Sequence, residues 1–196
     1  MSHLLPLFVT LAGRRVVLVG GGPVAAAKLQ QLLPTGADVI VVAPEICEAI
    51  TKWGCAPFRT VRREFVPADL DEAWLAVAAA TPTVNRDVAR AAEARRIFVN
   101  AVDDPANATA FLSGVVRREG VTIAISTDGA APALTSLLRQ ALDSVLPTDL
   151  PLWVAKARSL RVEWRRGGTP IGQRRPMLLQ ALNDLYRSSA REKSSR

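Results

Sequence analysis

The segment from Arg15 to Ala26 constrains the fold more than any other part of the chain. Residues 16–19 are all apolar, which predicts a buried parallel strand. A run of three glycines follows, and after it apolar residues recur at helical spacing. Ala25 is small enough for that helix to pack closely on the strand. A strand, a glycine turn and a helix in this order form the fingerprint of a dinucleotide site, with the phosphates at the helix N-terminus.

We assign cofactor binding to five consecutive residues of this fingerprint: Gly20, Gly21, Gly22, Pro23 and Val24. Gly20 permits the tight turn, and Gly22 lets the backbone approach a pyrophosphate. Pro23 suits the first helical turn, where its missing N–H is not needed. An ordinary glycine turn is the alternative, but the strand before it and the helix after it favour cofactor binding.

The rest of the chain divides into an alternating part and an appended part. Apolar stretches predict strands at 38–43, 58–65, 73–80 and 97–102, with helices at 45–53 and 84–96. This alternation predicts an α/β fold with a Rossmann-like, doubly wound parallel sheet, whose ligand lies outside the carboxyl ends of the strands. A hairpin at 111–118 and 121–126 then precedes helices at 131–146, 152–165 and 174–188.

We therefore expect an NAD-binding domain at 1–110, a dimerisation region at 111–146 and a small basic helical domain at 147–196. The two appended parts are too small to bury much apolar surface alone, so we expect a homodimer formed through them.

The net charge of +7 lies entirely in the last quarter of the chain, where residues 147–196 carry 11 basic and 4 acidic side chains. Such a basic segment is suited to nucleic acid, an acidic membrane surface or a polyanionic small molecule, or it is a solvated helical face. Charge alone does not choose among these.

Several classes of protein are disfavoured. No apolar run is long enough to span a membrane, and the first residues lack the pattern of a signal peptide, so we expect a cytoplasmic protein. Cys47 and Cys55 have no CxxC spacing and are expected to be free thiols. His3 is the only histidine, which leaves no Ser-His-Asp set, and we expect no metal site.

The end of the second predicted strand reads Ala43-Pro44-Glu45. Ala43 stands where an acidic residue usually binds the adenosine ribose, and Glu45 comes two residues later. Glu45 either reaches the ribose or stabilises the first turn of the next helix. No arginine follows this strand to accept a 2′-phosphate, which favours NAD over NADP.

Two other strand ends carry polar residues. Asp103 and Asp104 follow the strand at 97–102, and on extended backbone their side chains would point to opposite sides. One of them then faces the cleft, unless Asp-Asp-Pro is a plain turn. Ser126 and Thr127 precede the helix that starts near Pro132, and they form either an anion site at its N-terminus or an ordinary N-cap.

Taken together, these segments resemble precorrin-2 dehydrogenase, the N-terminal module of sirohaem synthase, which also occurs as a free-standing protein. The matching segments occur in family order over residues 1–147: Leu5-Pro6-Leu7-Phe8, Gly13-Arg14-Arg15, the glycine fingerprint, Val42-Ala43-Pro44-Glu45, Ala79-Ala80-Thr81 with Asn85, residues 99–105 and residues 123–134. The last two blocks are the ones specific to this family. The basic tail resembles the family's small helical domain only in its general type.

The resemblance implies NAD-dependent oxidation of precorrin-2 to sirohydrochlorin, with Asp103 as the catalytic general base. It also implies ferrous iron as a second substrate in members that make sirohaem. It adds Ala80, Thr81 and Asn100 to the cofactor-binding residues Ala43, Pro44 and Glu45.

The substrate of this family carries eight carboxylates, which would account for the basic tail. We assign substrate binding to Ser126, Thr127, Arg158 and Arg161, with Arg165 and Arg166 as further candidates on the same predicted helix. No nucleic acid or membrane partner is then needed. The alternative is an NAD-sensing regulatory domain whose basic tail binds nucleic acid, although no recognisable nucleic-acid-binding motif is present.

Overall fold

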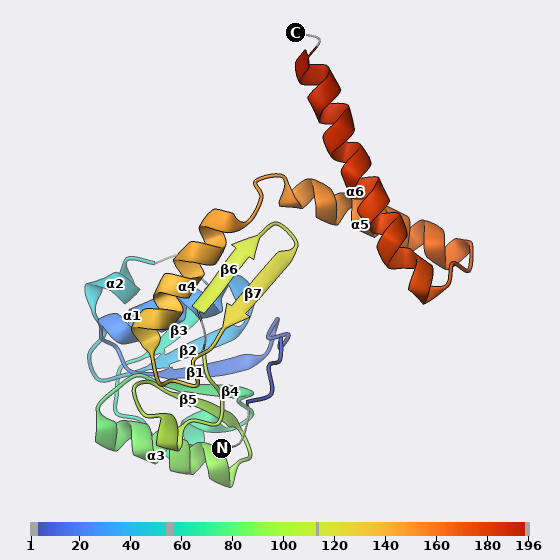
Figure 1. Ribbon diagram of the computed structural model, residues 1–196. Coiled ribbons are helices and arrows are strands. Elements are labelled where there is room, and N and C mark those ends of the chain that lie inside the picture. Colours follow the sequence, from blue (N-terminus) through green and yellow to red (C-terminus); the bar gives the residue numbers. More distant parts are fainter. Residues whose placement is uncertain (1–3, 54–56, 113, 195–196) are drawn as a thin grey trace. The chain divides into compact units, whose positions relative to one another are not determined.

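The computed structural model describes residues 4–53, 57–112 and 114–194, so His3 and Cys55 lie outside the described residues (Figure 1). The chain forms two compact units. The first comprises Met1–Leu112 with Ser126–Pro132, and the second comprises Ser113–Ile125 with Ala133–Arg196. The loop at 126–132, which we expected in the dimerisation region, therefore belongs to the first unit.

The first unit contains a five-stranded, wholly parallel sheet in the order β3-β2-β1-β4-β5. Its strands are β1 (Arg15–Val19), β2 (Asp38–Val42), β3 (Phe58–Val61), β4 (Leu75–Ala78) and β5 (Phe98–Ala101). Its helices are α1 (Pro23–Leu32), η1 (Leu33–Thr35), α2 (Glu48–Thr51), η2 (Pro67–Leu70), α3 (Pro82–Ala94) and η3 (Pro105–Asn107). The predicted α/β fold with a doubly wound parallel sheet is confirmed.

The two faces of this sheet are covered by different helices (Figure 1). On one face, α1 and α2 bury a cluster that includes Leu18, Leu29 and Val77. On the other face, α3 and η2 bury a second cluster that includes Val17 and Val88. Since β1 is buried on both faces, its continuous apolar run reflects a central parallel strand.

The helix predicted at 45–53 is much shorter in the structure. It begins only at Glu48, because the N–H of Cys47 donates to the Gly21 carbonyl oxygen at 2.8 Å and keeps the preceding residues out of the helix. The strands predicted at 58–65 and 73–80 are also shorter, ending at Val61 and Ala78. Pro67 and Pro82 start the next helical elements, and each sets a boundary beyond which the strand does not continue.

The second unit contains the predicted hairpin and three helices. The antiparallel strands β6 (Gly114–Arg118) and β7 (Val121–Ile125) are followed by α4 (Pro132–Val145), α5 (Leu150–Arg166) and α6 (Ile171–Ser194). Arg118 joins the hairpin to α4 by donating to the backbone carbonyl of Asp143 at 2.7 Å. Trp153 of α5 meets Tyr186 of α6 edge to face, with ring centroids 5.9 Å apart. No described helix is long and apolar enough to cross a membrane.

Candidate functional site

The glycine turn lies where the order of the strands reverses. β1 is flanked by β2 and β4, which is the position where open α/β sheets bind their ligands. Gly20 has a φ of 129°, and a Cβ atom there would lie 2.2 Å from the Ala79 carbonyl oxygen. Its N–H donates to the carbonyl oxygen of Val42 at 2.9 Å. The turn is thus fixed against the carboxyl ends of both neighbouring strands, and no larger residue fits at Gly20.

The next two glycines have different surroundings. A Cβ atom on Gly21 would lie 1.8 Å from the Glu45 carbonyl oxygen, whereas one on Gly22 would meet nothing within 4 Å. Gly22 is the N-cap of α1, and no described side chain hydrogen-bonds to this end of the helix. Pro23 occupies the first turn, and the Val24 side chain is exposed. The N-terminus of α1 is thus uncovered, and the glycine backbone beside it has no side chain in the way, which suits the pyrophosphate of a dinucleotide.

The loop after β2 packs directly on this turn. Ala43 is buried and donates its N–H to the Val61 carbonyl oxygen at 3.1 Å, while Pro44 and Glu45 are exposed. The acidic residue in the first turn of α2 is Glu48. Glu45 lies three residues before α2 and so outside its first turn, and its role toward a ribose stays a prediction.

The loop after β4 is held by a residue that we did not predict as a site residue. Asn85 of α3 is buried, and its Oδ1 accepts the N–H of Ala80 at 2.9 Å. Thr81 is the N-cap of α3, and its carbonyl oxygen accepts the N–H of Asn85 at 2.9 Å. The other buried residues of α3 are Val88 and three alanines. An asparagine on this apolar face was the feature of the sequence that could have identified Asn85.

Asn100 lies on β5 beside Val77, so its side chain belongs to the face of the sheet that α1 covers. The residue is 6% exposed. Its Nδ2 donates to the Ala110 carbonyl oxygen at 3.0 Å, but its Oδ1 is buried with no partner among the described residues. A buried acceptor of this kind normally has a partner, which an ordered water molecule or a bound group would supply.

The two adjacent carboxylates differ in their surroundings. The expectation that Asp103 and Asp104 lie on extended backbone is wrong, because β5 ends at Ala101 and Asp103 is in the left-handed region with a φ of 56°. Asp104 accepts the Nδ2 of Asn107 at 2.8 Å and so belongs to the following turn. Asp103 is exposed. A left-handed aspartate costs about 1–3 kcal/mol, a cost that is common at functional sites.

The loop at 126–132 lies beside the turn that holds Asp103. A Cβ atom on Gly129 would lie 3.2 Å from Pro105 and 3.4 Å from the ring of Phe111. Within the loop, the Thr127 hydroxyl accepts the N–H of Ala131 at 3.2 Å, and the Ser126 hydroxyl accepts the N–H of Asp128 at 3.1 Å. Residues far apart in the sequence are thereby brought to one edge of the first unit.

Lys28 of α1 is a charged residue that sequence reasoning did not single out. It lies on α1, half-buried, and burial lowers the pKa of its ammonium group. The negative charge of Asp103 acts in the opposite direction and raises that pKa. The signal in the sequence is that Lys28 is the only charged residue of α1.

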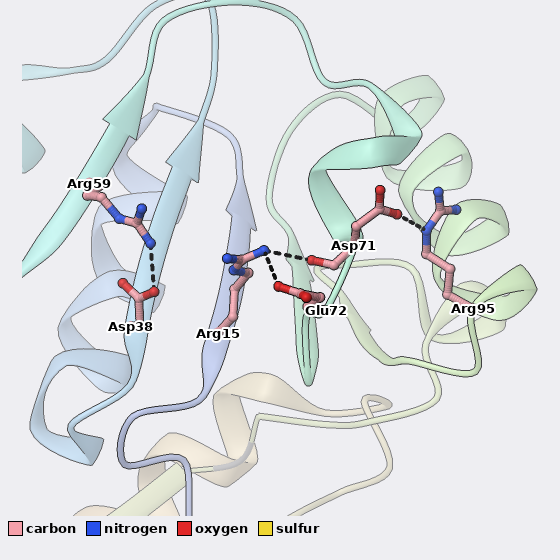
Figure 2. Close-up of polar contacts among 6 residues, drawn as sticks. All are labelled: Arg15, Asp38, Arg59, Asp71, Glu72 and Arg95. Carbon is pink, nitrogen blue, oxygen red and sulfur yellow. Dashed lines mark hydrogen bonds and ion pairs between the residues drawn. The ribbon is translucent and has the colours of Figure 1, made fainter.

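The opposite, amino end of the sheet carries a row of ion pairs (Figure 2). Arg59 of β3 pairs with Asp38 of β2 at 2.6 Å, and Arg15 of β1 pairs with Glu72 at 3.4 Å. Arg95 pairs with Asp71 at 2.9 Å beside a shallow depression of about 310 Å³. Because these charges are paired with one another, they do not form a second candidate ligand site at the amino end of the sheet.

Arg158 and Arg161 lie on α5 in the second unit, where both are exposed, as are Arg165 and Arg166. None of the four makes an ion pair with another described residue. Their role toward a substrate stays a prediction. Nor does the described part of the chain contain a group of three or more His, Cys, Asp or Glu side chains arranged to hold a metal ion.

Comparison with known proteins gives two family matches. Residues 7–114 match the family described as putative NAD(P)-binding, and residues 118–144 match the family described as sirohaem biosynthesis protein, central. The first match covers the glycine turn and Asp103, and the second covers most of the hairpin and α4.

Individual proteins match over nearly the whole chain. "Siroheme synthase 2" of Klebsiella pneumoniae is 41% identical over 177 residues, which are 89% of this chain and 38% of that protein. "Siroheme synthase" of Photorhabdus laumondii is 38% identical over 184 residues, which are 93% of this chain and 39% of that protein. The chain thus spans less than two fifths of these relatives.

A solved structure described as "SirC, precorrin-2 dehydrogenase" matches over most of both chains. The identity is 26% and the TM-score is 0.72, and the match covers 94% of this chain and 92% of that one.

Proposed function

Since the chain belongs to the family of the sirohaem synthase N-terminal module and SirC precorrin-2 dehydrogenase, with its NAD(P)-binding and central domains, we propose that it oxidises precorrin-2 to sirohydrochlorin with NAD. The observation that carries the proposal is the match to SirC, because it extends over 92% of that chain and leaves no large part without a counterpart. The siroheme synthases support the same family but are more than twice as long.

The carboxyl end of the sheet has the features that the cofactor requires. Gly22 leaves the backbone open to the pyrophosphate at the N-terminus of α1. Glu45 follows β2 with a free carboxylate, which suits a ribose hydroxyl, and no basic residue lies between it and α2. This supports NAD over NADP. When bound, NAD supplies the acceptor for a hydride.

The chain itself supplies the group that takes the proton. As hydride leaves precorrin-2, the substrate must also lose a proton to form the new double bond, and Asp103 accepts it. Asp103 is exposed, whereas Asp104 is bonded to Asn107. The Asn100 Oδ1 supplies one further acceptor at the same edge. The proton and the hydride together account for the two electrons and two hydrogens that the substrate loses.

We propose that the basic side chains of α5 bind the carboxylates of the tetrapyrrole. Arg158, Arg161, Arg165 and Arg166 are exposed and unpaired within the described residues, so no internal ion pair must break when an acidic group binds. Replacing Arg158 and Arg161 by Gln should raise the KM for precorrin-2 by about tenfold or more, as loss of a charge-assisted contact does. Equal effects on the Kd of NAD would contradict this role.

We also propose a homodimer formed through α4. This helix has no buried residue, and it exposes five apolar side chains at helical spacing: Leu134, Leu137, Leu138, Leu142 and Val145. A second copy of the chain would cover this stripe. Sedimentation equilibrium should give twice the chain mass, and the Leu137→Glu variant should sediment as a monomer. A monomeric wild-type protein would contradict the proposal.

The function is tested by anaerobic turnover of freshly made precorrin-2 with NAD, followed by the absorbance of sirohydrochlorin. The wild-type protein should form product, and Asp103→Asn should lower kcat by about 10²-fold or more, the usual effect of removing a general base. Asp104→Asn is the matched control, because it makes the same chemical change at the neighbouring position and should retain most of the activity. Adding ferrous iron to the same mixture tests for sirohaem formation.

If the folded wild-type protein binds NAD but forms no product, the dehydrogenase proposal fails. The alternative, an NAD sensor that binds nucleic acid through its basic helices, then predicts DNA or RNA binding that weakens steeply with salt.

A further inference from the structure

Arg62 follows the last residue of β3, at the carboxyl end of the sheet. β3 pairs in parallel with β2, and the register places Val61 beside Val42. The pairing continues one step further, since the N–H of Ala43 donates to the Val61 carbonyl oxygen at 3.1 Å. Neighbouring strands lie about 4.8 Å apart, so Arg62 leaves the sheet directly beside Ala43.

Ala43 stands at the position from which dinucleotide-binding folds recognise the ribose of the adenosine. An acidic residue there binds the 2′-hydroxyl of NAD, whereas an arginine nearby accommodates the 2′-phosphate of NADP. The loop after β2 supplies Glu45 but no basic residue before α2 begins. The sheet adds a basic residue from the adjacent strand, Arg62, which the sequence of the loop after β2 does not reveal.

The backbone turns sharply at Arg62. The Val61 carbonyl oxygen also accepts the N–H of Arg63 at 3.2 Å, which makes Arg62 the central residue of a three-residue turn at the end of β3. The Arg62 side chain is exposed, and it forms no ion pair or hydrogen bond with another residue that the structure describes. No internal contact of this guanidinium therefore has to break when an anion binds.

The neighbouring basic residues already have carboxylate partners. Arg63 donates to Asp69 at 2.8 Å, and Lys52, at the end of the helix that follows β2, pairs with Glu48 at 3.0 Å. Of the described residues between β2 and η2, Arg62 is the one basic residue without such a partner. Its positive charge is thus available at the strand ends where the ribose of a dinucleotide is recognised.

We infer that Arg62 is a specificity-determining residue of the cofactor site, and that its guanidinium binds the 2′-phosphate of NADP. The protein then binds NADP as well as NAD, with Glu45 favouring the ribose hydroxyl and Arg62 favouring the phosphate. A guanidinium suits a phosphate because it donates two parallel hydrogen bonds and stays charged. This inference rests on the proposed function, since that function places the cofactor at the glycine turn. The loop that carries Glu45 packs on this turn, because its carbonyl oxygen would lie 1.8 Å from a Cβ atom on Gly21.

Titration calorimetry with NAD and with NADP tests this role without turnover. The wild-type protein should bind both cofactors, with a Kd for NADP no more than about tenfold above the Kd for NAD. Arg62→Gln should raise the Kd of NADP about tenfold or more, because a charge-assisted contact to phosphate is lost, and should leave the Kd of NAD within about twofold. Glu45→Gln removes a negative charge that repels the 2′-phosphate, so it should lower the ratio of the NADP Kd to the NAD Kd.

Arg59→Gln is the matched control for Arg62→Gln. Arg59 lies on the same strand, but it pairs with Asp38 at the amino end of the sheet (Figure 2), so its loss should leave both Kd values unchanged. Arg62 has no described partner to lose, so Arg62→Gln should keep the urea midpoint of the wild-type protein. Raising the salt concentration should weaken NADP binding more steeply in the wild-type protein than in Arg62→Gln.

The outcomes separate this inference from the dehydrogenase function. If the wild-type protein binds NAD but not NADP, or if Arg62→Gln weakens both cofactors equally, the inference is overturned and the dehydrogenase function is unaffected. If Arg62→Gln loses NADP selectively but the wild-type protein does not oxidise precorrin-2, the role of Arg62 is supported and the dehydrogenase function is refuted. Failure to bind either cofactor overturns both proposals.

Discussion

Substitutions at the three glycines of the turn should separate effects on folding stability from effects on cofactor binding. Gly20 and Gly21 are fixed by the fold itself, since a Cβ atom would lie 2.2 Å and 1.8 Å from backbone oxygens of neighbouring loops. Gly22 has φ −86° and ψ −173°, which any residue adopts, and open space in place of a Cβ. Gly22→Ala is thus the substitution that the fold tolerates and a bound pyrophosphate does not.

Two opposing terms set the effect of Gly22→Ala on stability. Replacing a glycine whose backbone conformation suits alanine stabilises a protein by about 0.4–1 kcal/mol, because the unfolded chain loses freedom. Alanine is a poorer N-cap than glycine, and this costs up to about 1 kcal/mol. The free energy of unfolding should therefore change by less than about 1 kcal/mol. The added methyl group occupies the approach of the pyrophosphate to α1, so the Kd of NAD should rise at least about tenfold, or 1.4 kcal/mol.

Titration calorimetry with NAD and urea unfolding of the same samples measure the two quantities. Gly21→Ala is the matched control: its methyl group meets the Glu45 carbonyl oxygen, so it should cost about 1–3 kcal/mol of stability as an overpacked site does. If Gly22→Ala binds NAD with a Kd within twofold of the wild-type value, the glycine turn is not the pyrophosphate site. If Gly21→Ala is as stable as the wild-type protein, the packing of this loop on the turn is not as described.

Three further predictions concern the scaffold around the site. Leu29→Ala, at a position 1% exposed, should lower the free energy of unfolding by about 2–5 kcal/mol in urea; a smaller loss would mean that α1 packs loosely. Asn85→Leu leaves the Ala80 N–H without its acceptor and should cost about 1 kcal/mol and weaken NAD binding, as calorimetry would detect. Hydrogen bonds from Arg63 hold the pKa of the Asp69 carboxyl below its ordinary value near 3.8. The charged carboxylate therefore stabilises the folded protein above that value, and this contribution is lost as pH falls. Urea midpoints should therefore show Asp69→Asn as destabilising at pH 7 and nearly neutral at pH 2, and equal losses at both would contradict this.

Local patterns were sufficient to predict the sheet. The strands β1, β2, β4 and β5 are largely buried, so each appears in the sequence as a short, mainly apolar run between helical patterns, whereas the edge strand β3 has no buried residue. The glycine turn was equally visible, because Gly20 and Gly21 must be glycine for steric reasons that act within the motif and its nearest loops. Helix 45–53 was predicted too long, since its start depends on the hydrogen bond from Cys47 to Gly21, which joins residues far apart in the sequence.

The environment of Asp103 could not be predicted from local patterns. Its left-handed backbone results from the way the chain leaves β5 and returns as residues 109–112, where Thr109 and Ala110 donate their N–H groups to the Val99 carbonyl oxygen at 2.9 Å. The buried position of Asn100 depends on that return, because its Nδ2 donates to the Ala110 carbonyl oxygen, and on the register that puts it beside Val77.

The two ends of the sheet show how this unit separates stability from function. At the amino end, exposed arginines and carboxylates are paired, as Figure 2 shows for Arg15, Arg59 and Arg95. Such exposed pairs contribute about 0–1 kcal/mol each, so the apolar clusters on the two faces of the sheet must stabilise the fold. At the carboxyl end, Asp103 is exposed and the Asn100 Oδ1 is buried, and neither has a partner among the described residues. A protein selected for stability alone would pair such polar groups, so their presence supports our proposal that ligands bind at the carboxyl end of the sheet.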